Sequence, residues 1–123
     1  MFTEIQSARQ IPLLVVIVNY RTPNLTINCL RSLVNEVQTL PGMQVVVVDN
    51  ASGDGSVEKI THAIETEGWG SWASLLPSDC NGGFAYGNNA AIRPALQSPN
   101  PSPYYLLLNS DTEVRPNALK ILV

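Results

Sequence analysis

The chain has 123 residues, of which 45% are hydrophobic and 14% are charged, so it can bury the core of one domain and is not a disordered chain. Its net charge is −3 and no segment is strongly basic, which argues against nucleic-acid binding through phosphate neutralisation. The longest apolar run, from Ile11 to Val18, contains a proline and is too short to span a bilayer, so no transmembrane segment is expected.

The N-terminus and the cysteines indicate a cytoplasmic protein. Glu4 and Gln6 stand where a secretory signal peptide would carry basic residues. Cys29 and Cys80 have neither the spacing of a metal site nor the surroundings of a disulfide framework. We therefore expect both side chains to be reduced thiols.

The first part of the chain predicts a strand, a helix and a second strand. After a polar lead-in over about residues 1–10, an apolar run predicts a strand over about residues 12–18. Thr22 and Pro23 suit the N-cap and first position of one helix, which a proline–glycine turn closes. Four valines at 45–48 predict the second strand. The helix should bury one apolar stripe, formed by Ile27, Leu30, Leu33, Val34 and Val37.

The second part alternates in the same way. Three prolines at 99–103 allow neither a helix nor a central strand, so this segment is a loop. His62 should face solvent, and Trp69 and Trp72 should pack rather than bind sugar. The expected elements are a helix over about Ser56–Glu67 burying Val57, Ile60 and Ile64, a weaker strand over 72–76, a helix that begins within the glycine-rich residues 81–89 and ends near Leu96, a strand over 104–108, and a helix opened by Pro116.

These elements predict an α/β fold. A strand that is apolar on both faces belongs inside a parallel sheet covered by helices. We therefore expect residues 1–123 to form one Rossmann-like domain, with a mostly parallel sheet and helices on both faces.

Three of the predicted strands run directly into polar clusters. Asn19-Tyr20, Asp49-Asn50 and Asn109-Ser110-Asp111 follow the first, second and fourth strands. In open α/β sheets the ligand binds outside the carboxyl ends of the strands. The three clusters therefore predict one shared site.

Each candidate motif has a competing interpretation. Asp49 stands where a nucleotide-binding unit places the carboxylate that holds a ribose or base edge, whereas Asp54 is also suited to an Asx-type turn before the next helix. The turn at 19–23 lacks the glycines of a dinucleotide fingerprint, which excludes an NAD site. Gly82 and Gly87 have the spacing of a P-loop, but the Lys-Ser/Thr pair that follows the second glycine of a P-loop is absent. A glycine turn that opens a helix can still hold a diphosphate. The alternative is a plain turn from loop to helix.

The pair Asn109-x-Asp111 predicts a cation site. A carbonyl oxygen and a carboxylate two residues apart can reach one hard cation, and Mg²⁺ commonly takes one or two protein carboxylates with phosphates completing its shell. The alternative is a cap for the following turn. A phosphotransfer enzyme with a D-x-D motif is disfavoured, because Asn109 cannot serve as the nucleophile.

Taken in order, four segments resemble the family 2 glycosyltransferases of GT-A fold, and most closely their rhamnosyltransferase-like members. The segments are residues 15–20 (VVIVNY), 47–56 (VVDNASGDGS), 81–89 (NGGFAYGNN) and 107–112 (LLNSDT). Together they are spread over residues 15–112, most of the length of the chain.

The resemblance implies a nucleotide-sugar site built from seven residues, with Asn109 as an additional metal ligand. Its nucleobase side would be formed by Asn19, Tyr20 and Asp49. Asp111, with Asn109 in place of the usual acidic residue, would hold Mg²⁺ or Mn²⁺ on the diphosphate. The diphosphate would also be lined by Asn81, Gly83 and Asn89.

The implied reaction is transfer of a sugar, with inversion, from a dTDP- or UDP-linked donor to a hydroxyl of a glycan or lipid-linked acceptor, in synthesis of a cell-envelope polysaccharide. The chain would be a fragment truncated at its C-terminus that supplies the donor-binding half, with the general base beyond Val123. The parent protein would associate peripherally with a membrane, and the fragment would self-associate through exposed apolar surface. The alternative is a non-catalytic nucleotide-binding module or a truncated remnant.

Overall fold

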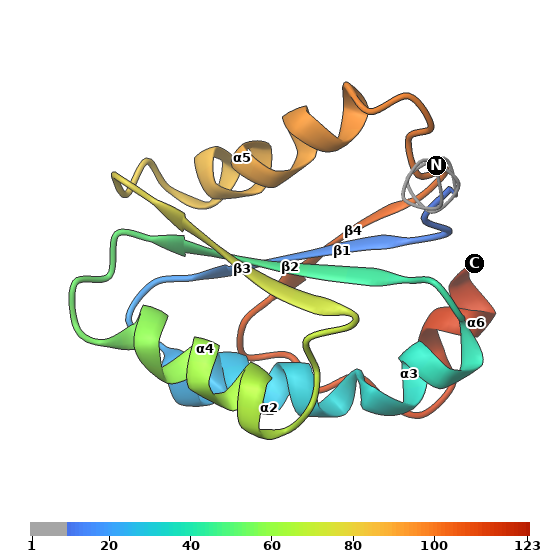
Figure 1. Ribbon diagram of the computed structural model, residues 1–123, viewed down its shortest axis with the longest axis horizontal. Coiled ribbons are helices and arrows are strands. Elements are labelled where there is room, and N and C mark those ends of the chain that lie inside the picture. Colours follow the sequence, from blue (N-terminus) through green and yellow to red (C-terminus); the bar gives the residue numbers. More distant parts are fainter. Residues whose placement is uncertain (1–9) are drawn as a thin grey trace.

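The computed structural model describes residues 10–123, so the predicted polar lead-in lies outside the described residues except for Gln10. Its four strands form one sheet in the order β3-β2-β1-β4 (Figure 1). Every pairing is parallel, as the valine-rich segments predict. The strands are β1 (Leu14–Asn19), β2 (Gln44–Asn50), β3 (Ala73–Ser78) and β4 (Tyr105–Asn109).

Helices cover both faces of this sheet, which confirms the predicted α/β architecture. In Figure 1, α5 lies above the sheet and the other helices lie below it. Alternate residues of β1 separate the two cores: Val15 and Ile17 face the larger one, and Leu14 and Val16 face α5. The helices are α2 (Pro23–Ser32), α3 (Val34–Thr39), α4 (Ser56–Thr66), α5 (Phe84–Leu96) and α6 (Ala118–Leu122).

The prediction of one continuous helix after β1 is wrong, because the helix breaks between α2 and α3. The Ser32 hydroxyl donates to the Cys29 carbonyl oxygen at 2.6 Å, and that oxygen is the acceptor that the Leu33 N–H would use in a continuous helix. The Leu33 N–H instead bonds to the Leu30 carbonyl oxygen at 2.9 Å, a tighter turn.

Three further boundaries differ from the sequence prediction. The first strand begins at Leu14 rather than residue 12, and β3 extends to Ser78 past Pro77, which the edge position of β3 permits. The last helix begins at Ala118 rather than Pro116. Asn117 has a left-handed backbone with φ of 66°, which prevents a right-handed helix from running through it.

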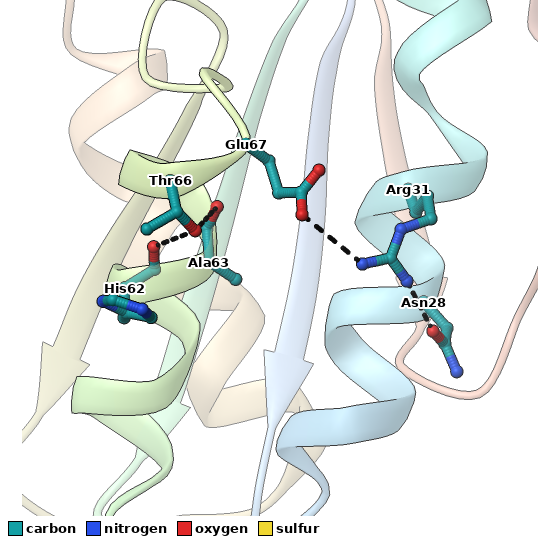
Figure 2. A network of polar contacts seen from close by, with 6 residues as sticks. All are labelled: Asn28, Arg31, His62, Ala63, Thr66 and Glu67. Atoms are coloured by element: carbon teal, nitrogen blue, oxygen red, sulfur yellow. Dashed lines mark hydrogen bonds and ion pairs between the residues drawn. The ribbon is translucent and has the colours of Figure 1, made fainter.

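The surface between α2 and α4 carries an exposed polar network (Figure 2). Arg31 donates to Asn28 Oδ1 at 2.9 Å and lies 3.9 Å from a Glu67 carboxylate oxygen. Because both charged side chains are about half exposed, this ion pair contributes little to stability. Nearby, His62 is exposed as predicted, and its carbonyl oxygen accepts the Thr66 hydroxyl at 2.8 Å.

Gly87 lets α5 approach the end of the sheet closely. A Cβ atom at this position would lie 2.9 Å from Asn50 Oδ1 and 2.9 Å from a Val18 methyl group. The glycine-rich segment that predicts a turn therefore also contains the glycine that allows α5 to pack closely against the sheet.

Trp69 and Trp72 pack as predicted, with ring centroids 5.8 Å apart. None of the helices within residues 10–123 combines the length and apolarity needed to cross a bilayer.

Candidate functional site

The carboxyl ends of β1, β2 and β4 open into one hollow of about 290 Å³, at the edge of the sheet where the sequence predicts a site. The segment that leads from β3 into α5 forms its other wall. The hollow is lined by Val18, Tyr20, Thr22, Asn50, Asn81, Gly83, Phe84 and Ser110.

A buried polar network joins the ends of β1 and β2. Asn19 donates to Asp49 Oδ1 at 2.8 Å and accepts the Thr26 hydroxyl at 2.7 Å. Asp49 also accepts the Ser52 hydroxyl at 2.7 Å and the Ser52 N–H at 3.0 Å. Asn19 and Asp49 are only 0% and 2% exposed, so these two predicted site residues lie behind the lining of the hollow and fix the strand ends that form it.

Tyr20 projects from the end of β1 with 40% of its surface exposed. The Arg21 guanidinium lies 5.0 Å from the centroid of the Tyr20 ring, an attractive cation–π arrangement. Arg21 is itself held by Ser52, whose carbonyl oxygen accepts the Arg21 Nε–H at 3.0 Å. The ring is therefore a supported aromatic surface at the rim of the hollow.

Asn50 ties the end of β2 to the turn that opens α5. Its Nδ2 donates to the Gly83 carbonyl oxygen at 2.9 Å and lies 3.4 Å from Asn81 Oδ1. Asn81 Oδ1 also accepts the Gly83 N–H at 3.1 Å. Gly83 has φ 94° and ψ −177°, a backbone conformation that essentially only glycine adopts. This explains the glycine at that position.

The N-terminus of α5 faces this hollow, and no side chain within residues 10–123 caps it. Its first N–H groups and the positive end of the helix dipole can therefore interact with an anion. The wall of the hollow thus offers donors suited to a phosphate group.

Asp111 and Asn109 lie at the exposed end of β4. Burial first, and the negative charge of Asp111 second, raise the pKa of the Cys29 thiol to about 12. Across residues 10–123, no three His, Cys, Asp or Glu side chains gather into a cluster that could hold a metal ion. One carboxylate and one amide fit a cation such as Mg²⁺ that takes its remaining ligands from phosphate and water.

Asn89 lies apart from the other predicted site residues. It lines a second hollow of about 320 Å³ with Tyr86, Ala90 and Arg93 on α5. The structure therefore brings Tyr20, Asn81 and Gly83 together in one hollow and leaves Asn89 outside its lining. The assignment of Asn89 to a nucleotide-sugar stays a prediction.

Sequence reasoning missed the contributions of Asn50, Ser110 and Thr22 to the lining. Asn50 and Ser110 each stand in a polar cluster that follows a strand, and that position could have identified them as lining residues.

For Asp54 the turn interpretation holds, because Asp54 Oδ1 accepts both the N–H and the hydroxyl of Ser56. The Ser56 hydroxyl chiefly holds the pKa of Asp54 below its ordinary value.

A family model described as glycosyl transferase family 2 matches residues 14–123. No curated protein matches the sequence.

Several solved structures share the fold, two of them with a nucleotide sugar bound. A mannosyltransferase, PcManGT from Pyrobaculum calidifontis in complex with GDP-Man and Mn²⁺, is 26% identical with a TM-score of 0.60 over 72% of this chain. S. aureus TarS 1–349 in complex with UDP-GlcNAc is 24% identical with a TM-score of 0.68 over 89% of this chain. The chain spans 26% and 29% of the lengths of these two structures.

Proposed function

This chain belongs to glycosyl transferase family 2, and from that premise we propose that its strand-end hollow binds the nucleotide-diphosphate sugar of a glycosyltransferase reaction. One observation carries the proposal: the ends of three parallel strands and the uncapped N-terminus of α5 line a single open hollow of about 290 Å³. Ligands of open α/β sheets bind in this position.

The nucleobase would lie on the Tyr20 side of the hollow. An exposed ring backed by a guanidinium offers a flat surface for stacking. Asn19 and Asp49 would support this side from behind. A direct hydrogen bond from the base or ribose to Asp49 stays a prediction from the sequence resemblance, because Asp49 is 2% exposed and already accepts three internal hydrogen bonds.

The diphosphate would lie against Asn81, Gly83 and the first turn of α5, where N–H groups and the helix dipole favour negative charge. Asp111, with the Asn109 amide oxygen, would hold Mg²⁺ or Mn²⁺ there. When bound, the cation would neutralise the charge that develops on the departing nucleoside diphosphate. The Mn²⁺ that accompanies GDP-Man in the Pyrobaculum mannosyltransferase supports a divalent cation.

For the whole protein we propose transfer of the sugar, with inversion, to a hydroxyl of a glycan or lipid-linked acceptor. GDP-Man and UDP-GlcNAc, which accompany the two similar structures, support the class of nucleotide-diphosphate sugar. A dTDP- or UDP-linked donor and a role in cell-envelope polysaccharide synthesis stay predictions from the sequence resemblance. A cytoplasmic location stays a prediction from the N-terminus and the cysteines.

Calorimetric titration of the chain with UDP, dTDP and GDP, with and without Mn²⁺, tests this function. We expect one of the nucleotides to bind and Mn²⁺ to strengthen its binding roughly tenfold, about 1.4 kcal/mol. Asp111→Ala should remove the Mn²⁺-dependent part alone, and Glu65→Ala, an exposed carboxyl on α4, is the matched control.

Failure of a folded sample to bind any of the three nucleotides would overturn the proposal. Binding that is the same with and without Mn²⁺ would retain the nucleotide site and remove the metal assignment. That second result would favour the alternative of a non-catalytic nucleotide-binding module.

A further inference from the structure

The segment that follows β4, residues 109–119, is attached to α2 and α3 by a column of polar side chains. Figure 1 shows this segment running from the end of β4 past these helices to α6. Thr22, Cys29, Ser32 and Glu36, at the start of α2, within α2 and within α3, all bond to this segment. Their partners, in the same order, are the Ser110 hydroxyl, the Asn109 carbonyl oxygen, the Val114 N–H, and the N–H groups of Asn117 and Leu119.

Ser32 joins the break between α2 and α3 to the segment after β4. Its Oγ donates to the Cys29 carbonyl oxygen at 2.6 Å and accepts the Val114 N–H at 2.9 Å. The first bond fixes the direction of the hydroxyl hydrogen, so the oxygen lone pairs are left facing the second partner. The bond that breaks the helix between α2 and α3 therefore also orients the acceptor for the segment after β4.

Asp111 lies between two attached positions. On one side the Ser110 hydroxyl lies 3.2 Å from the Thr22 hydroxyl, and both residues line the strand-end hollow. On the other side Val114 is held by Ser32. The Thr112 N–H also bonds to the Asn109 carbonyl oxygen at 3.1 Å, which closes the turn. A short turn held at both ends presents its carboxylate in a limited set of positions.

We propose that Ser32 is a positioning residue of the donor site: by holding Val114 it fixes the turn that carries Asp111 at the edge of the hollow. The inference rests on the proposed function, in which Asp111 holds the cation on a nucleoside diphosphate. Ser32 itself would touch neither the nucleotide nor the cation.

The test compares Ser32→Ala with Ser32→Thr, which keeps the hydroxyl, and with Asn35→Ala at an exposed position of α3. In hydrogen exchange, Ser32→Ala should reduce the protection of the Val114 amide and increase that of Leu33, whose N–H can then bond to Cys29. In titrations with UDP, dTDP or GDP, whichever binds, the tenfold gain from Mn²⁺ should fall to about twofold while metal-free affinity is kept. Ser32→Thr should restore both readouts.

Two results would overturn the proposal. One is a Ser32→Ala variant with unchanged Val114 exchange. The other is an Mn²⁺-dependent gain equal to that of the wild type. If the wild type binds none of the nucleotides, the proposed function fails by itself, and the exchange of Val114 still decides whether Ser32 holds the turn.

Discussion

Replacement of Glu36 by alanine should lower the free energy of unfolding by roughly 3 kcal/mol. Glu36 is fully buried, with an exposed fraction of 0%, and its two carboxyl oxygens accept the N–H groups of Asn117 and Leu119 at 2.9 and 3.0 Å. Removing the side chain leaves both donors without that partner, and an unsatisfied buried donor costs about 1–3 kcal/mol. Chemical denaturation followed by circular dichroism measures the change.

Glu36→Gln is the matched variant, because its amide keeps one carbonyl acceptor and presents an NH₂ group to the other N–H. It should lose less stability than Glu36→Ala. Glu58→Ala on the exposed surface of α4 controls for the loss of a carboxyl group and should change stability by less than about 0.5 kcal/mol. If Glu36→Ala were as stable as that control, the two hydrogen bonds from Glu36 to the start of α6 would not stabilise the fold.

Replacement of Asp49 by alanine should cost a similar amount, about 3 kcal/mol, because it removes the acceptor of three internal hydrogen bonds. The donors left behind, on Asn19 and Ser52, belong to residues with 0% exposure. Asp49→Asn should be intermediate, because its amide cannot accept at both of the positions that the carboxylate uses.

A double-mutant cycle with Asn19→Ala separates this network from general damage to the strand ends. Because Asn19 Nδ2 donates directly to Asp49 at 2.8 Å, the two substitutions together should cost at least about 1 kcal/mol less than the sum of their separate costs. Strictly additive costs would show that the two side chains do not stabilise each other. Denaturation midpoints of the four proteins, with their slopes, provide the measurement.

The parts of the structure that follow from sequence are those set by periodicity and by local turn chemistry. The four valines of 45–48 are apolar and β-branched at every position, which is typical of a strand buried on both faces, and they form part of β2. The carboxylate of Asp54 stands two residues before Ser56, so its turn is encoded within three residues.

Features that depend on contacts between residues far apart in the chain could not be predicted from periodicity or turn chemistry. The break at Ser32 is sustained by its bond to Val114, 82 positions away in the chain, whereas a serine within a helix is unremarkable in a sequence. Asn88 is buried and Asn89 exposed, because successive helix residues point about 100° apart. The motif alone does not fix which of the two asparagines faces the sheet.

The position of the bound nucleotide can be located through the backbone amide resonances of the ¹⁵N-labelled chain during titration with UDP and Mg²⁺. We predict saturable shifts at Asn50, Gly83, Phe84 and Ser110, which line the strand-end hollow. The resonances of Tyr104 and Leu122, at the opposite ends of the strands, should not move. Shifts confined to the second hollow around Tyr86, Asn89 and Arg93 would show that the nucleotide does not bind in the strand-end hollow. The absence of a saturable shift with UDP, dTDP and GDP would show that the chain has no nucleotide site.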